Sequence, residues 1–227
     1  MNYEQARFNM IEQQIRPWEV LDNQILSLLA IIKREDFVPL AHRALAFVDM
    51  EIPLTPDVLS QPGQCMLSPK VEARMLQDLA VQKRDTVLEI GTGSGYMAAL
   101  LGHCARHVTT LEIAPALAAS ARVNLQRAGI INADVIVADG AAGLPTTGPL
   151  AASFDVIVLS GSVAAVPQEL LARLKVGGRL GSIVGHEPMM RATLVTRVAE
   201  DAWRTTQAWD TVAPRLLNFP EPSKFVF

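Results

Sequence analysis

The chain has 227 residues, of which 50% are hydrophobic and 19% are charged, and its formal net charge at pH 7 is -3. This length and apolar content fit one globular domain with a buried core. Lysine and arginine are scattered along the chain rather than clustered. The composition therefore predicts no binding to nucleic acid and none to an anionic membrane surface.

The apolar runs of the chain are short, as at residues 28–32, whereas a membrane-spanning helix needs about 20 apolar residues. Residues 1–16 contain no apolar core of a signal peptide. The two cysteines, Cys65 and Cys104, lie in a chain that is long enough to need no disulfide. We therefore expect a cytoplasmic protein with two free thiols.

The N-terminal part predicts a helical cap. Apolar residues recur at helical spacing over residues 3–16, and Asp22 is a suitable N-cap for a second amphipathic helix over 22–33. Segment 34–67 contains four prolines and no sustained period, which is typical of a loop with short strand pieces. We expect residues 1–67 to form this cap and loop within a single domain.

From residue 69 onward the pattern alternates between helix and strand. The predicted helices cover residues 69–82, 96–105, 115–128 and 167–174. The predicted strands cover residues 86–90, 107–113, 134–139, 154–160 and 178–185, with a weaker candidate at 190–199. Because these strands are apolar nearly throughout, they indicate the α/β class, with a mostly parallel sheet that has helices on both faces. Residues 68–200 form the predicted core.

Residues 201–227 predict an extended C-terminal tail, because they include Pro214, Pro220 and Pro222. The apolar residues of this tail would be costly to leave in water. We expect the tail to pack on the core or on a second copy of the chain, which would make a homodimer. The residues concerned are Leu216, Leu217 and Phe219.

A glycine-rich loop joins the first predicted strand of the core to the following helix, in the sequence "VLEIGTGSGY". Glycines at such a position let the backbone approach a ligand, and the helix N-terminus offers free N–H groups. A dinucleotide fingerprint requires glycine at position 96, which is Tyr96, and a P-loop requires a lysine that this loop lacks. Both pyrophosphate ligands are therefore disfavoured.

A cationic cofactor fits this loop better, because the loop has no Lys or Arg and follows Glu89. S-adenosylmethionine carries a sulfonium and an ammonium group. Glu112 ends the second strand, where its carboxylate can accept both ribose hydroxyls, and Asp139 ends the third, where it can receive the adenine amino group. The predicted cofactor-binding residues are Glu89, Gly91, Thr92, Gly93, Gly95, Glu112, Ile113, Asp139 and Gly140.

His103, Cys104 and His107 imitate a metal-ligand cluster. The end of a helix and the start of a strand point these side chains in different directions, and no complementary pair lies nearby in the sequence. We predict no metal site.

Five segments of the chain together carry a family resemblance: "REDFVP", "VLEIGTGSGYMAALL", "VTTLEI", "VIVADGAAGLP" and "FDVIVLSGSVAAVPQELLARLKVGGRLGSIVG". They resemble the protein-L-isoaspartate O-methyltransferase family of class I methyltransferases, and the match covers roughly residues 8–187. The resemblance implies a Rossmann-like fold with an N-terminal helical cap over a seven-stranded sheet. It also implies methyl transfer from S-adenosylmethionine to the side-chain carboxylate of isoaspartyl residues in damaged proteins.

Segment 63–73, "GQCMLSPKVEA", departs from this pattern. The family has a segment like G-Q-T-I-S-Q-P, whose Thr and Ser lie at the active site, and the alignment places Cys65 at the Thr and Leu67 at the Ser. Ser68 lies one residue later, and it has two candidate roles: N-cap of a helix with Pro69 at its first position, and catalytic contact with the methyl acceptor. A carboxylate needs alignment and exclusion of water rather than a general base, so the missing hydroxyls do not exclude methyl transfer.

The acceptor stays open at this point. The first candidate is an isoaspartyl residue of a protein or peptide. The second is a small carboxylate or hydroxyl compound, which the apolar Leu67 favours. The third candidate belongs to another class, a cofactor-binding module without turnover.

Overall fold

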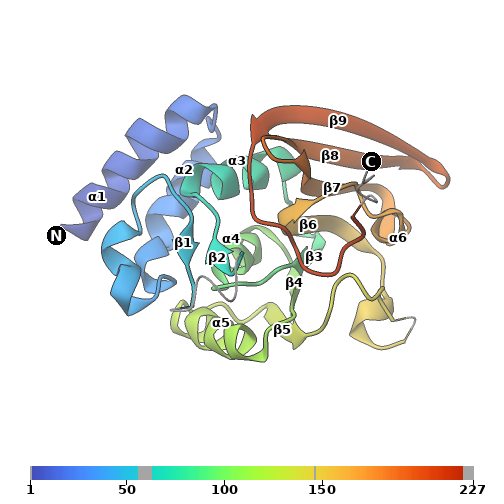
Figure 1. Ribbon diagram of the computed structural model, residues 1–227, viewed down its shortest axis with the longest axis horizontal. Helices are drawn as coiled ribbons and strands as arrows, with labels where there is room; N and C mark the ends of the chain where they lie inside the picture. The colour runs from blue at the N-terminus through green and yellow to red at the C-terminus, as the bar shows by residue number, and fades with distance from the viewer. Residues whose placement is uncertain (1, 56–62, 146, 222–227) are drawn as a thin grey trace, which may run out of the picture.

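The computed structural model describes residues 2–55, 63–145 and 147–221, and its centre is a seven-stranded sheet in the order β5-β4-β3-β6-β7-β8-β9 (Figure 1). The parallel strands are β3 (Thr86–Ile90), β4 (His107–Glu112), β5 (Ala133–Val137), β6 (Phe154–Val163) and β7 (Leu174–His186). Strands β8 (Met189–Ala199) and β9 (Ala202–Thr211) extend one edge in antiparallel register. The predicted mostly parallel seven-stranded sheet is confirmed.

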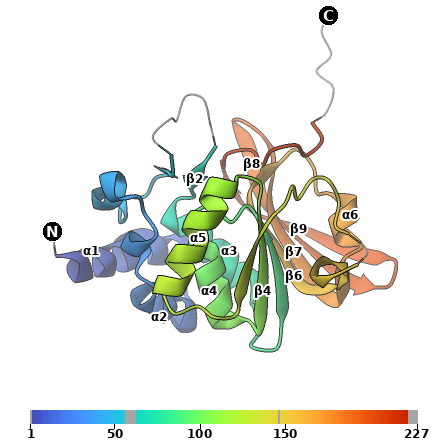
Figure 2. The same cartoon turned by 90° about the horizontal axis from the view of Figure 1, so that it is seen from below.

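The helices cover the two faces of the sheet unequally (Figure 2). Helices α3 (Pro69–Leu79), α4 (Tyr96–Cys104) and α5 (Pro115–Arg127) lie on one face, and the short α6 (Gln168–Leu171) lies on the other with a 3-10 turn at Pro149–Ala151. Neighbouring side chains of a strand point to opposite faces, so Val87 joins the apolar cluster under α3 and α4 whereas Leu88 joins the cluster near α6. The expected fold class is therefore confirmed.

The N-terminal segment forms the expected helical cap beside α3 (Figure 1). It consists of α1 (Tyr3–Met10), a π-helical turn at Ile11–Ile15, 3-10 turns at Arg16–Trp18, Arg34–Asp36 and Leu40–Leu45, and α2 (Asn23–Ile31). The small sheet of β1 (Ile52–Pro53) and β2 (Cys65–Met66) follows. The fully buried Arg34 fastens the cap to the core, because it pairs with Glu72 of α3 and donates to the carbonyl oxygen of Leu67.

Two sequence predictions need correction. The segment predicted as a tail over 201–227 is not separate from the core along its whole length, because its first part is strand β9, which pairs with β8 in the central sheet. Most side chains of this edge strand are exposed on both faces, so β9 has no hydrophobic period that a sequence pattern would detect. The helix predicted over 167–174 is also too long: α6 ends at Leu171, and β7 already begins at Leu174.

Cys65 and Cys104 are free thiols, as expected. Among the residues that the structure describes, no helix combines the length and the apolar character needed to cross a bilayer.

Candidate functional site

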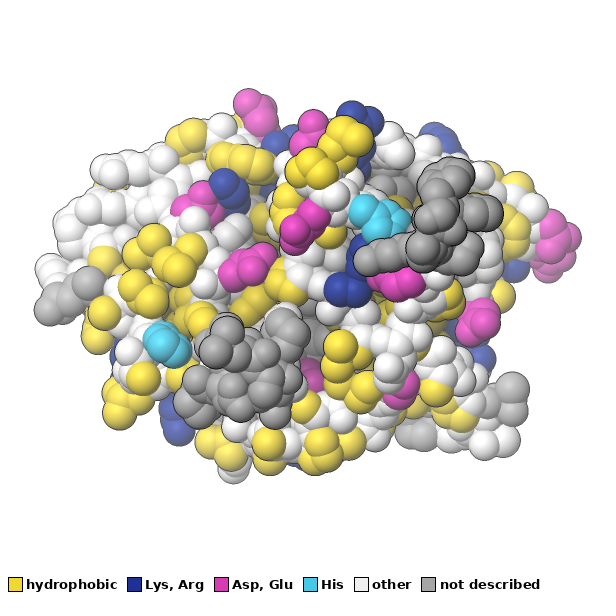
Figure 3. Space-filling view, viewed as in Figure 1, with side chains coloured by type: hydrophobic (Ala, Val, Ile, Leu, Met, Phe, Trp, Pro, Cys, Tyr) yellow, Lys and Arg dark blue, Asp and Glu magenta, His cyan; other side chains and the backbone are white. Residues whose placement is uncertain are grey.

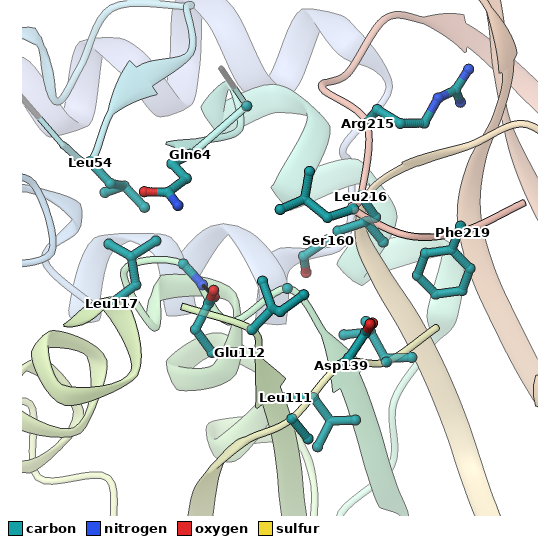
Figure 4. A pocket seen from close by; sticks show the side chains of 18 of the residues that line it. Leu54, Gln64, Leu111, Glu112, Leu117, Asp139, Ser160, Arg215, Leu216 and Phe219 are labelled. Atoms are coloured by element: carbon teal, nitrogen blue, oxygen red, sulfur yellow. Dashed lines mark hydrogen bonds between the residues drawn. The ribbon is translucent and has the colours of Figure 1, made fainter. Parts of the chain in front are cut away.

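The sheet order creates a crevice between β3 and β6. Strands β4 and β5 follow β3 on one side, whereas β6 and β7 lie on the other, so the chain leaves the carboxyl ends of β3 and β6 in opposite directions. An open cleft of about 680 Å³ lies at this edge of the sheet (Figures 3 and 4). Its walls come from the strand ends of β3, β4, β5 and β6, from residues 63–65, and from residues 215–219.

The glycine loop after β3 forms the floor of the cleft. Gly91 and Gly93 line it, and both have positive φ values, 96° and 53°. A Cβ on Gly91 would lie 3.0 Å from Cδ2 of Leu216 on the opposite wall. Glycine therefore keeps this part of the cleft open.

Gly95 lies where two helices pack together. It precedes the first residue of α4 with φ 85°, and it does not line the cleft. A Cβ at this position would lie 3.3 Å from Cγ of Leu125 and 3.4 Å from Cβ of Ala121, both in α5. We therefore assign Gly95 to the packing of α4 against α5.

Glu112 projects into the cleft from the end of β4 (Figure 4). Its Oε2 accepts a hydrogen bond of 2.8 Å from the backbone N–H of Gly93, and its Oε1 accepts one of 3.0 Å from the N–H of Ala114. A carboxylate offers about four lone-pair sites, so each oxygen retains acceptor capacity for a ribose hydroxyl. The same side chain also holds the glycine loop in place.

Asp139, Gly140 and Ile113 also line the cleft, on the side of β4 and β5. The Oδ1 of Asp139 accepts a hydrogen bond of 2.9 Å from the N–H of Ala141, and its Oδ2 accepts one of 2.7 Å from Nδ2 of Asn218. Gly140 packs tightly, because a Cβ there would lie 2.4 Å from Cγ2 of Ile90. These residues form a wall with one acidic group among apolar surfaces.

Glu89, which lies behind the glycine loop, and Thr92, which belongs to the loop, line a smaller inner pocket that shares Cys65, Gly91, Gly93 and Ser160 with the cleft. Glu89 is fully buried, and its carboxylate accepts hydrogen bonds of 2.7 Å from the hydroxyls of Thr110 and Ser160. Burial raises the pKa of Glu89 to about 8, although these two hydroxyls oppose the rise. The hydroxyl of Thr92 lies 2.6 Å from that of Thr110, so Thr92 braces the sheet.

Residues 213–219, which we call the strap, form the wall opposite Glu112. The strap is fixed to β6: the N–H of Ser162 donates to the carbonyl oxygen of Pro214 over 2.7 Å, and the N–H of Leu216 donates back to Ser162 over 2.9 Å. Leu216 and Phe219 line the cleft from this segment (Figure 4). The tail therefore packs on the core of its own chain, which is one of the two expected arrangements.

The cleft fits S-adenosylmethionine in the chemistry of its walls. No Lys or Arg belongs to the glycine loop, and the carboxylates of Glu112 and Asp139 face the cleft from adjacent strand ends. A ligand with vicinal hydroxyls, a purine amino group and a positive sulfonium suits this set of acceptors. Glu89 lies closest to the loop on its inner side, where a cationic group would favour the ionised carboxylate.

Comparison with known proteins agrees with this geometry. The family model described as protein-L-isoaspartate(D-aspartate) O-methyltransferase (PCMT) matches residues 5–212. The chain belongs to the PCMT family. A Koribacter versatilis protein-L-isoaspartate O-methyltransferase is 38% identical over 191 residues, which cover 84% of this chain and 81% of that protein. The Rhodopseudomonas palustris enzyme of the same name is 36% identical over 220 residues, covering 94% and 96% of the two chains.

Solved structures of PCMT proteins share the fold. A candidate protein-L-isoaspartate O-methyltransferase from Plasmodium falciparum, solved in complex with S-adenosyl-L-homocysteine, superposes with a TM-score of 0.76 at 16% identity. This match covers 95% of the present chain and 98% of that one. A second solved protein-L-isoaspartate O-methyltransferase gives a TM-score of 0.71 at 22% identity, covering 92% of this chain and 65% of the other.

Within the PCMT fold, segment 63–68 reaches the cleft without the expected hydroxyls. Cys65 lines the cleft, and its Sγ lies 3.8 Å from Oε2 of Glu51. Burial raises the pKa of this thiol to about 12. Leu67 lines the inner pocket and is 9% exposed, whereas Ser68 belongs to neither the cleft nor the inner pocket.

Ser68 occupies the N-cap position of α3, but its side chain makes no capping hydrogen bond. Its carbonyl oxygen accepts from the N–H groups of Val71 and Glu72 instead. The prediction of a side-chain cap at Ser68 is therefore wrong, although the predicted start of the helix at Pro69 is confirmed. The catalytic role of Ser68 has no support from its position.

Sequence reasoning missed two parts of the site. Ser160 ends the predicted strand 154–160 and lines both the cleft and the inner pocket, and the polar residue at a strand end beside the crevice was an available signal. Leu216, Phe219 and Arg215 of the strap also line the cleft. No local pattern identifies them, because their position depends on contacts with residues about fifty places earlier.

Proposed function

We propose that this PCMT-family chain is an S-adenosylmethionine-dependent O-methyltransferase that acts on the carboxylate of isoaspartyl residues in damaged proteins. The observation that carries the proposal is the cleft between β3 and β6, whose cation-free glycine loop faces two strand-end carboxylates. The homologues named protein-L-isoaspartate O-methyltransferase support this substrate.

Each part of the cleft has a task in this reaction. When bound, S-adenosylmethionine supplies a methyl group on a sulfonium, and transfer to a carboxylate leaves a methyl ester and S-adenosylhomocysteine. Glu112 binds and orients the ribose, and Asp139 accepts the adenine amino group. Glu89, Gly91, Gly93, Ile113 and Gly140 complete the cofactor site in this proposal, with Glu89 holding the positive end beside the inner pocket.

The acceptor reaches the methyl group from the side of the inner pocket. Leu67 and Met97 supply the apolar part of the lining of this pocket, and Ser160 presents a hydroxyl to both the inner pocket and the cleft. A carboxylate is a sufficient nucleophile near neutral pH, so these residues contribute alignment and a dry surrounding. The Ser160 hydroxyl donates to Glu89 over 2.7 Å, which leaves its oxygen as an acceptor.

Formation of S-adenosylhomocysteine tests the proposal. The chain is incubated with S-adenosylmethionine and either an isoaspartyl peptide or the same peptide with normal aspartate. We expect product with the isoaspartyl peptide and a mass increase of one methyl group on it, with none on the control. Cofactor binding without product for any acceptor would contradict the proposal and indicate a binding module.

A small carboxylate or hydroxyl compound is the second candidate acceptor. The observation that favours it is a mostly apolar pocket next to the inner pocket, lined by Leu67, Val71, Met75, Met97, Val158, Leu159 and Ile183 together with Glu72 and Ser160. Leu67 replaces the hydroxyl that the family has at this point. Product formed with a metabolite extract but not with the peptide would select this candidate.

We propose the cytoplasm as the location and a damaged protein as the partner. The two free thiols are consistent with a reducing compartment. A homodimer through the C-terminal residues stays a prediction. Phe219 is buried within its own chain, whereas Leu217 is 52% exposed and is therefore the residue that a second copy could cover.

A further inference from the structure

A carboxylate of the chain itself is bound at the rim of the cleft. The Oε1 of Glu221 lies 2.6 Å from Nε of Arg215, and its Oε2 lies 3.2 Å from Nε2 of His186. Arg215 belongs to the strap, and His186 is the last residue of β7. One carboxylate therefore joins two basic side chains that come from different parts of the fold.

The fold positions Arg215 independently of Glu221. Its Nη2 donates to the carbonyl oxygen of Gly185 over 3.0 Å, and its Nη1 lies 3.4 Å from Oγ of Ser162. The backbone on either side of Arg215 is fastened to Ser162 by the two strap hydrogen bonds. The Arg215 side chain is 27% exposed, so these contacts orient the group while solvent still reaches it. This is a preorganised group for an anion.

Arg215 is also the single cation among the described residues that line the cleft. The charged side chains that share this lining, Glu112 and Asp139, are acidic. Figure 4 shows the guanidinium of Arg215 directed away from Ser160, toward the outer rim. A carboxylate bound to Arg215 would therefore lie at the outer rim of the cleft, away from the inner pocket where the acceptor is proposed to bind.

We propose that Arg215 and His186 form a subsite for an acidic side chain, Asp or Glu, that flanks the isoaspartyl residue of a protein substrate. Glu221 occupies the subsite as an intramolecular stand-in and yields it to the substrate. The proposal rests on the proposed function for the identity of the acceptor. Glu221 is 46% exposed, so the exchange of one carboxylate for another requires no burial of a new charge.

Peptide binding tests the subsite without need for turnover. A set of fluorescein-labelled isoaspartyl peptides with amidated C-termini is made, in which Glu or Gln is placed in turn at each of the three positions before and after the isoaspartyl residue. The dissociation constant of each peptide is measured in the presence of S-adenosylhomocysteine. We expect at least one Glu peptide to bind more tightly than its Gln counterpart. In the Glu221→Gln variant, the affinity for that Glu peptide should rise by a further factor of roughly 3 to 10, and the affinity for the Gln peptide should be unchanged.

Substitutions of Arg215, which pairs with Glu221, complete the test. Arg215→Gln should weaken the preferred Glu peptide about tenfold and remove its advantage, whereas Arg215→Lys should keep part of it. Glu12→Gln is the matched control, since Glu12 pairs with Arg16 on an exposed helical turn, and it should change neither peptide. A Gln peptide with a free C-terminus distinguishes a terminal carboxylate from a side chain.

The outcomes separate this inference from the proposed function. If Glu and Gln peptides bind equally at every position, if a terminal carboxylate alone gives the gain, or if no peptide binds, the subsite is overturned. Preferential binding that depends on Arg215, but without methyl transfer to any peptide, would support the subsite and contradict the proposed function.

Discussion

At the scale of single residues, Glu112 links the cofactor site to the fold. Its two oxygens accept from the N–H groups of Gly93 and Ala114, and thereby join the glycine loop to the start of α5. The same oxygens face the cleft, where they can accept ribose hydroxyls. A change at this position therefore affects both the preorganisation of the loop and the contact with the ligand.

We predict that Glu112→Ala lowers the affinity for S-adenosylhomocysteine by about 1.5–3 kcal/mol, or about 10- to 150-fold, because hydrogen bonds to a charged group are lost. Glu112→Gln should show a smaller loss, since one oxygen remains. Calorimetry measures both. Asp134→Asn is the control. Asp134 lies at the start of β5, whereas the cleft lies at the carboxyl ends of the strands, so this variant should leave the affinity unchanged. Equal affinity in Glu112→Ala would rule out the ribose role.

Glu89 is the second decisive residue, because its burial raises the pKa of the carboxyl group above neutral pH. Its pKa of about 8 lies above the ordinary value of 4.5. In the ligand-free protein the folded state therefore retains a proton that the unfolded chain releases. The contribution to stability is fully present below about pH 4.5 and is lost as pH rises through about 8.

The same titration predicts the pH dependence of cofactor binding. Because a cationic ligand pairs with ionised Glu89, the affinity for S-adenosylmethionine should rise with pH between 6 and 7.5, by up to about tenfold per pH unit. Glu89→Gln keeps the partners Thr110 and Ser160 but cannot ionise. It should bind more weakly and with no such slope. Calorimetry at several pH values measures both; a flat profile in the parent protein would contradict the assignment.

At the scale of elements, two helix starts that both have a capping residue type in the sequence differ in structure. Asp22 caps α2 through its side chain, which accepts from the N–H of Gln24 over 2.7 Å. Ser68 precedes α3 without a side-chain capping bond. A capping residue and a following proline therefore predict where a helix begins, but they do not predict the side-chain rotamer.

We predict that Asp22→Ala lowers the free energy of unfolding by about 0.5–2 kcal/mol, the usual cost of removing a cap. Ser68→Ala should cost less than about 0.5 kcal/mol, because no hydrogen bond of its side chain is lost. Urea denaturation of the two variants compares them directly. A cost at Ser68 equal to that at Asp22 would show that its hydroxyl does cap α3.

Segment 63–68 carries the prediction about the acceptor. The double change Cys65→Thr with Leu67→Ser installs family-like hydroxyls in the inner pocket, and we expect a measurable gain in methylation of an isoaspartyl peptide over weak activity in the parent. Replacement of the buried Leu67 should cost about 2–5 kcal/mol of stability. Activity is therefore assayed at a temperature where both proteins are folded. Strong activity in the parent would show that these hydroxyls are dispensable.

Periodicity predicted some elements well and others not at all. The bounds of β3 agree with the prediction, because this strand, which is buried on both faces, is apolar at three of its five positions and lies between polar turns. β9 was missed, since an exposed edge strand has no such run. The shortness of α6 was also missed, because its apolar residues continue directly into β7.

At the scale of the whole molecule, the cofactor half of the cleft was predictable and the strap half was not. Glu112 ends β4, and Gly91 and Asp139 follow the ends of β3 and β5. Because parallel strands bring their carboxyl ends to one edge, sequence order alone predicts that the three residues meet. Leu216 and Arg215 reach the same cleft only through the backbone bonds of the strap to Ser162. Contacts of that range leave no local pattern in the sequence.

A crystal structure with S-adenosylhomocysteine and an isoaspartyl peptide tests most directly whether this cleft is the methyltransferase site. We expect the ribose hydroxyls within hydrogen-bond distance of Glu112, the adenine amino group at Asp139, and the sulfur facing the inner pocket at Ser160 and Leu67. The peptide carboxylate should approach the sulfur from the side of residues 65–67. A cofactor bound elsewhere, or a sulfur directed away from the inner pocket, would contradict the account.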